Sequence, residues 1–188
     1  MRVFAGIAVS AAIARKLSAL YDALAQCGEG LKMVPAGNLH ITLRFLGEIE
    51  EKQATLFSEH LTRALAGINP FALQVDGFGC FPDARNPRVL WVGTEKSSDL
   101  SELYRCAEKC AMEIGLPPEK DFKGHITVAR VKKRIDMRTF RDILIRFSSE
   151  NWGSMDVKNI IVYQSIIGQS GPTYHPIKTI TLGGNPHG

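Results

Sequence analysis

Apolar residues recur along the chain with two periodicities, which separate expected strands from expected helices. Alternation and short apolar runs indicate strands over residues 2–9, 71–76, 88–93, 152–163 and 174–182, and through the segments His40–Phe45 and His125–Arg130. Apolar residues at helical spacing predict helices over residues 11–27, 51–66, 99–115 and 136–146. Asp99 and Glu102 have the spacing of a capping box. The Gly- and Pro-rich residues 77–87 predict a loop, and residues 183–188, with His187, predict a frayed tail.

Two of the expected strands carry the same motif, His-x-Thr. Side chains alternate faces along a strand, so His40 and Thr42 share one face of the first. His125 and Thr127 share one face of the second in the same way. The intervening Ile residues face the other side and suit a core. One imidazole and one hydroxyl from each strand form a set of four groups suited to surround a small anion.

The two motifs lie in a long internal repeat. From Phe4 to His40 and from Val89 to His125 the chain advances by the same 36 residues. The next helical pattern begins 11 residues after the histidine in both halves. The repeat of strand, helix, motif strand and helix predicts two lobes related by an approximate two-fold axis, with both motif strands facing one cleft. Two core histidines satisfied by threonines would leave this repeat unexplained.

Composition limits the class of protein. The chain has 188 residues, 45% of them hydrophobic and 22% charged, which fits one domain, residues 1–188, made of two lobes that share a core. The net charge of +4 suits an anionic or nucleic-acid partner without requiring one. No apolar run reaches the ~20 residues of a membrane-spanning helix. Residues 4–14 could pass for a signal-peptide core, but their alternation and their place in the repeat predict a strand.

The cysteines point to a reducing compartment. Cys27, Cys80, Cys106 and Cys110 show no spacing typical of a disulfide framework or a metal site, so free thiols are expected. The cytoplasm is therefore the expected location, and a monomer the expected state.

Two histidines placed symmetrically about an anion favour paired acid and base catalysis. Imidazole titrates near pH ~6.5, so one ring can carry a proton while the other is neutral. The neutral ring can take a proton from water and the charged ring can give one to a departing alkoxide. Two histidines without a third protein ligand fall short of a catalytic zinc site, so neither a metal nor a cofactor is expected. Ser-His-Asp acyl transfer lacks the Gly-x-Ser-x-Gly turn.

In these residues the chain resembles the 2H phosphoesterases, and within them the RNA 2′,3′-cyclic phosphodiesterases, also known as 2′-5′ RNA ligase-like proteins. Besides the two motifs, the resemblance rests on four stretches, which are residues 2–4, 38–47, 87–91 and 165–174. It covers nearly the whole chain. One departure is Lys123-Gly124, where relatives usually carry Pro just before the second motif histidine.

The resemblance implies an α+β fold of two lobes, with two antiparallel sheets flanking a central cleft and helices outside. It implies hydrolysis of 2′,3′-cyclic phosphates at RNA ends to leave 2′-phosphates. His40 would then be the proton donor and His125 the proton acceptor, with Thr42 and Thr127 as phosphate ligands. By strand alternation, Arg44 shares the face of His40 and is a candidate substrate ligand. Arg130, also a candidate, is placed on the face opposite His125.

Two alternatives remain open at this point. One is another 2H activity served by the same four residues, such as 2′-5′ ligation of RNA or hydrolysis of small cyclic or 2′-5′ linked nucleotides. The other is a protein that binds RNA ends without turnover, although binding alone needs no matched pair of titrating groups.

Overall fold

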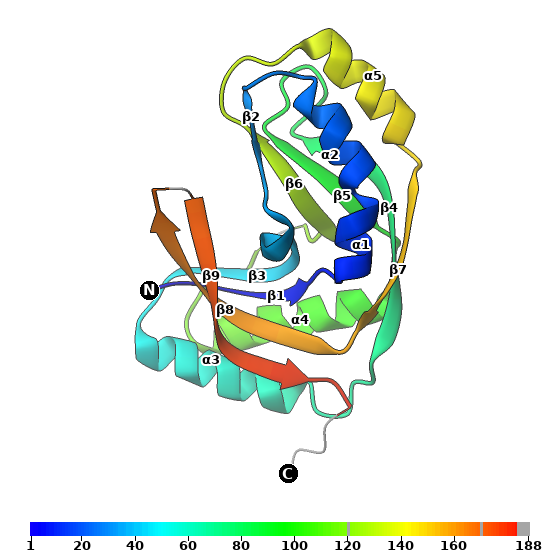
Figure 1. Ribbon diagram of the computed structural model, residues 1–188. Helices are drawn as coiled ribbons and strands as arrows, with labels where there is room; N and C mark the ends of the chain where they lie inside the picture. The colour runs from blue at the N-terminus through cyan, green and yellow to red at the C-terminus, as the bar shows by residue number, and fades with distance from the viewer. Residues whose placement is uncertain (120, 170, 184–188) are drawn as a thin grey trace.

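The computed structural model describes residues 1–119, 121–169 and 171–183 (Figure 1). The strands are β1 (Arg2–Ala8), β2 (Leu31–Met33), β3 (His40–Glu48), β4 (Phe71–Phe81), β5 (Val89–Thr94), β6 (His125–Val131), β7 (Asn151–Val157), β8 (Asn159–Gly168) and β9 (Gly171–Thr181). The helices are α1 (Ala11–Lys16), α2 (Ser18–Ala25), α3 (Glu51–Ala64), α4 (Ser98–Glu113) and α5 (Met137–Phe147), with a 3₁₀ turn η1 (Ala36–Asn38). The predicted tail, with His187, lies mostly outside the described residues. None of the described helices is both long and apolar enough to cross a membrane.

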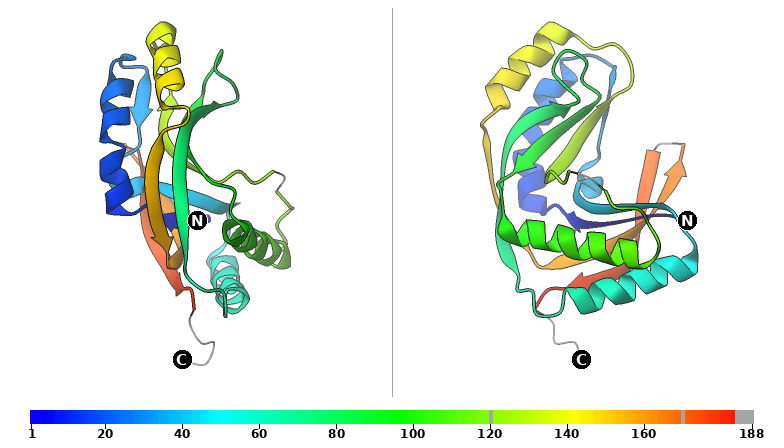
Figure 2. Two further views of the ribbon diagram at one scale, coloured as in Figure 1. Left: turned by 90° about the vertical axis from the view of Figure 1, so that its right-hand side faces the viewer. Right: turned by 180° about the vertical axis from the view of Figure 1, so that it is seen from behind.

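All strands belong to one antiparallel sheet that is divided at its centre. Its order is β7-β4-β5-β6-β3-β1-β8-β9, and β2 also pairs with β6. The two motif strands, β3 and β6, meet at a single pair, Ile41 and Ile126. The predicted α+β fold with two antiparallel sheets is confirmed as two halves of one curled sheet, and the join between them is where the motifs lie (Figures 1 and 2).

Helices α1, α2 and α4 are exchanged between the two halves. Helices α1 and α2 follow β1, yet they pack against β7, β2 and α5 in the other half. Helix α4 follows β5, yet it packs against β3 and α3. The stripe predicted for residues 11–27 is buried, with Ile13, Leu17, Leu20 and Leu24 at most 1% exposed, although the helix is interrupted at Leu17. Each half of the sheet is thus covered by a helix whose preceding strand lies in the other half.

Several predicted boundaries are wrong for identifiable reasons. Strand β4 continues through residues 77–81, because a bulge at Gly77 in its pairing with β5, with φ of +67°, absorbs the turn-forming residue within the strand. The predicted strand 152–163 breaks at Lys158, where the chain crosses from β7 in one half to β8 in the other. Helix α4 is capped by Ser97, whose hydroxyl accepts from the Leu100 amide at 3.1 Å, so Asp99 does not cap it.

Candidate active site

The join between the two sheet halves brings the four motif residues together. The side chains of Ile41 and Ile126 are fully buried beneath the join. Their neighbours along each strand therefore point to the opposite, concave side. Extending the antiparallel register of this one pair by one residue in each direction brings His40 toward Thr127 and Thr42 toward His125. Both imidazoles and both threonine side chains therefore lie on the same side of the sheet at the join, where the charge of His125 acts on the His40 ring.

Both imidazoles are held by the same kind of backbone contact. The Nδ1 atom of His40 lies 2.7 Å from the carbonyl oxygen of Asn38. The Nδ1 atom of His125 lies 2.7 Å from the carbonyl oxygen of Lys123. A carbonyl only accepts, so Nδ1 carries the hydrogen in each ring and Nε2 is left for proton transfer. The chain two residues upstream of each histidine therefore fixes its tautomer and ring orientation.

Burial lowers the pKa of both imidazoles below the ordinary value. The carbonyl contacts act in the opposite direction, because they favour the charged ring. Positive neighbours then add to the lowering: His125 and Arg130 for the His40 ring, and Lys123 and Arg130 for the His125 ring. The free protein consequently favours neutral imidazoles, and a bound phosphate would favour protonation.

The structure does not bring Arg44 into the site, and the prediction that it shares the face of His40 is wrong. The register between β1 and β3 skips Leu43, which is a β-bulge. The extra residue reverses the alternation, so Arg44 turns inward and is 3% exposed. Phe45 turns outward instead and is 38% exposed.

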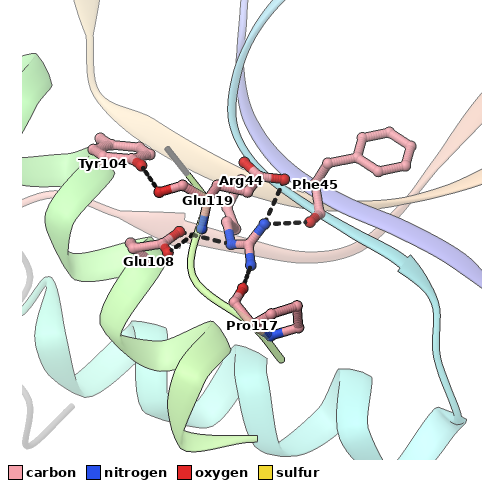
Figure 3. A network of polar contacts seen from close by, with 6 residues as sticks. All are labelled: Arg44, Phe45, Tyr104, Glu108, Pro117 and Glu119. Atoms are coloured by element: carbon pink, nitrogen blue, oxygen red, sulfur yellow. Dashed lines mark hydrogen bonds and ion pairs between the residues drawn. The ribbon is translucent and has the colours of Figure 1, made fainter. Parts of the chain in front are cut away.

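The Arg44 guanidinium binds the segment that leads to the second motif (Figure 3). Its Nε lies 2.8 Å from a carboxylate oxygen of Glu108 in α4, and its Nη1 forms an ion pair with Glu119. It also donates to the carbonyl oxygens of Phe45 and Pro117. Arg44 therefore joins β3 to α4 and to the loop that precedes β6.

Unlike Arg44, Arg130 lies on the same side as its motif histidine, because the second motif strand also contains a bulge. The register between β5 and β6 skips Val128, so Ala129 is buried and Arg130 lies on the side of His125 and Thr127. The prediction that it lies on the other face is wrong. Its charge acts with burial to lower the pKa of both His40 and His125.

Aromatic side chains pack against the His40 ring. Phe4 lies 4.7 Å from it, between ring centroids, and Tyr174 meets it edge-on at 5.1 Å. Tyr163 stacks on Phe4 at 5.0 Å. The Asn38 side chain donates to the Pro172 carbonyl at 3.0 Å, which ties the β8–β9 hairpin to the turn before His40. Sequence periodicity gave no signal for these tyrosines, although Tyr174 lies within a stretch of the resemblance.

The surroundings of His125 are more open and carry a cation. Phe81 and Trp91 lie 5.2 and 6.4 Å from its ring, and the Lys123 ammonium lies 4.1 Å from the centre of the Trp91 ring. A hollow of about 760 Å³ is bordered by Trp91, Gly93, Lys123 and Gly124 among others, but by none of the four motif residues. A Cβ at Gly124 would come within 2.5 Å of the Thr94 hydroxyl, so glycine replaces the usual proline without crowding β5.

No cluster of three or more His, Cys, Asp or Glu side chains able to hold a metal ion occurs within the described ranges. The side chains that meet at the join are imidazoles, hydroxyls, one guanidinium and aromatic rings. Such a set can exchange protons and donate hydrogen bonds to an anion.

Comparison with known proteins finds phosphoesterases. A family model described as LigT-like phosphoesterase matches residues 7–91. An RNA 2′,3′-cyclic phosphodiesterase from Archaeoglobus fulgidus is 34% identical over 178 residues, which are 95% of this chain and 98% of that protein. One from Aeropyrum pernix is 34% identical over 161 residues, 85% of this chain and 90% of that protein.

Comparison with solved structures points to the same family. The crystal structure of TT0787 from Thermus thermophilus aligns over 100% of both chains with a TM-score of 0.82 and 25% identity. That of E. coli LigT complexed with phosphate aligns over 96% of both chains, with a TM-score of 0.73 and 26% identity. The paired motifs, the divided sheet and these similarities together show that the chain belongs to the LigT-like phosphoesterase family of the 2H phosphoesterases.

Proposed function

We propose that this protein hydrolyses 2′,3′-cyclic phosphates at RNA ends to 2′-phosphates, without a metal. The observation that carries the proposal is the pair of imidazoles at the join, each with Nδ1 bound to a carbonyl and Nε2 free. The relatives named RNA 2′,3′-cyclic phosphodiesterase support this substrate, as do structures of E. coli LigT with 3′-AMP and with phosphate.

The two rings have different surroundings, which support different roles. The contact that holds the His125 ring is more exposed to solvent than the one that holds the His40 ring, and the Lys123 ammonium favours the neutral form of the His125 ring. His125 is therefore the proton acceptor. His40 is enclosed by Phe4 and Tyr174, a setting suited to the ribose of the substrate, and it is the proton donor.

The reaction follows in one displacement at phosphorus. The His125 Nε2 takes a proton from water as the water oxygen bonds to phosphorus. The bond from phosphorus to O3′ breaks, and the protonated His40 Nε2 gives its proton to that oxygen. The 2′-ester remains, so the product is a 2′-phosphate. Proton exchange with solvent then restores the neutral His125 and the charged His40.

The remaining polar groups stabilise the charge that develops on the non-bridging oxygens. The Thr42 and Thr127 hydroxyls lie beside the imidazoles and can donate to these oxygens. The Arg130 guanidinium supplies a positive charge on the same side. Their dipoles and charge are in place before the reaction, so little reorganisation is needed as it proceeds.

A panel of oligonucleotides tests the proposal. RNA ending in 2′,3′-cyclic phosphate is expected to yield a 2′-phosphate, while linear 3′-phosphate ends and 2′-5′ linkages remain unchanged. The His40→Ala/His125→Ala variant serves as the control. A 3′-phosphate product, or turnover that survives in this variant, would contradict the proposal.

A further inference from the structure

A strip of aromatic and cationic side chains leads away from His40 along β1 and β3. Phe4 lies against His40, and the Phe45 ring stacks in parallel with Phe4 at 6.2 Å and an interplanar angle of 6°. The Arg2 guanidinium lies over the Phe45 ring, 5.0 Å from its centre. Phe4 pairs with Phe45 and Arg2 with Glu48, so the strip runs along β3 away from the join with β6.

Phe45 and Arg2, the members of the strip farthest from His40, contribute little to the packing of the core. Phe45 exposes 38% of its surface, although simple strand alternation would place it in the core. In the described part of the chain, the Arg2 guanidinium takes part in no ion pair or hydrogen bond, and it lies instead over the Phe45 ring. The nearby Glu48 carboxylate pairs with the N-terminal ammonium at 3.6 Å. Phe45 and Arg2 are therefore presented together at the surface, where a ligand can contact them or take the place of one on the other.

The chemistry of the substrate determines which side of the site its chain occupies, and this step rests on the proposed function. Both ester oxygens of a 2′,3′-cyclic phosphate belong to the terminal ribose, which carries the rest of the RNA. His40 protonates the departing oxygen, so the ribose lies on its side. Water enters from the side of His125. The RNA must therefore leave the site past His40, where the strip begins.

We propose that Arg2 and Phe45 bind the nucleotides that precede the cyclic phosphate in a single-stranded RNA end. Phe45 stacks on a base, which suits any sequence because every base has a flat face. Arg2 pairs with a backbone phosphate. The chain of contacts from His40 through Phe4 and Phe45 to Arg2 connects these two residues to the His40 side of the site.

The test compares a trinucleotide ending in 2′,3′-cyclic phosphate with the cyclic mononucleotide of the same terminal base. Arg2→Gln and Phe45→Leu are each expected to lower the ratio of kcat/KM for trinucleotide to mononucleotide by about tenfold. Arg85→Gln, which removes a charge from a side chain 91% exposed in the β4–β5 loop, is the matched control. In Arg2→Gln the salt dependence of KM for the trinucleotide should also weaken by about 0.7 in logarithmic slope, the value for one phosphate of a single strand.

An unchanged ratio in both variants, or an equal fall in Arg85→Gln, would overturn the inference. Melting temperatures of the variants identify any loss of folding, and Arg2→Lys separates charge from stacking. Binding of a fluorescent trinucleotide, followed by anisotropy, makes the test independent of turnover. If the wild type binds it, weakened binding in Arg2→Gln and Phe45→Leu supports the strip even where no cyclic phosphate is hydrolysed, whereas equal binding refutes it.

Discussion

The guanidinium of Arg44 and the carboxylate of Glu108 form an ion pair of 2.8 Å that fastens the first motif strand to helix α4. Arg44 is 3% and Glu108 14% exposed at the side chain. Arg44→Ala would leave a poorly solvated carboxylate without its partner, and about 3 kcal/mol of stability should be lost. Urea denaturation measures this loss. Arg44→Met/Glu108→Leu should recover much of it, and a stable Arg44→Ala protein would show that the pair is dispensable.

Arg130→Gln should reduce activity and leave stability nearly unchanged, in contrast to Arg44→Ala. The guanidinium lies on the concave side with the imidazoles and is exposed, so the fold does not depend on it. Losing its charge should reduce kcat/KM for a cyclic phosphate by about a hundredfold, as expected for removal of a group that stabilises the transition state. The control is Arg134→Gln, an exposed arginine just beyond β6. Equal effects of the two substitutions would remove Arg130 from the mechanism.

Each threonine hydroxyl should contribute to the reaction and little to folding. Thr42→Val and Thr127→Val keep the side-chain shape and remove a donor to the phosphate. A loss of ~2–4 kcal/mol in transition-state stabilisation is expected for each, with the melting temperature nearly unchanged. Full turnover in the folded double variant would exclude the proposed contacts to the non-bridging oxygens.

The histidines should behave as a unit. His40→Ala and His125→Ala should each remove most of the turnover, and the double variant should be little worse, because groups that act together are non-additive. A nitrophenyl phosphodiester distinguishes the roles, since nitrophenolate departs without a proton. His40→Ala should be largely rescued on this substrate and His125→Ala should not. Rescue of His125→Ala alone would reverse the assignment, and loss of wild-type activity on chelation, restored by zinc, would exclude the metal-free scheme.

The pH dependence should follow from burial and from Lys123. The active form has one neutral and one protonated imidazole, so kcat/KM should rise and fall with pH in a bell. Both pKa values are lowered, so the maximum should lie below the ordinary imidazole value of about 6.5. Lys123→Gln removes a cation that disfavours the charged His125, so its pKa should rise and the bell should move to higher pH.

Lys52→Gln, an exposed charge on α3, provides the comparison for this last prediction. The same displacement in both variants would indicate a general effect of net charge. No displacement in Lys123→Gln would mean that the ammonium over Trp91 does not act on His125. The limbs of the bell belong to the coupled pair, so the displacement is read from the whole curve.

The sequence carried the repeat, the four motif residues and most of the helices, because these depend on local periodicity and spacing. It misplaced both arginines, and the cause is the same in each strand. A β-bulge adds one residue after the His-x-Thr unit, at Leu43 and at Val128, and reverses the alternation beyond it. A bulge is fixed by pairing with a neighbouring strand, which a periodicity within one segment does not reveal. For the same reason, the sequence did not predict that Phe45 is exposed and belongs to the strip with Phe4 and Arg2.

The aromatic rings that pack against His40 could not be predicted from the sequence, for a different reason. Tyr174 and Phe4 come from opposite ends of the chain, and they meet at His40 because β1 lies between β3 and β8. Such long-range neighbours depend on strand order. The two His-x-Thr units were thus predictable from local pattern, whereas the face on which each arginine lies and the aromatic surroundings depend on the fold.

The exchange of helices between the two halves has a consequence for synthesis. Helices α1 and α2 are synthesised more than 100 residues before α5 and β7, against which they pack. The apolar faces of α1 and α2 stay exposed until these partners have been made. The half that contains β7 cannot complete its core before residue 157 has been made, so protease resistance of the nascent protein should appear only after that point.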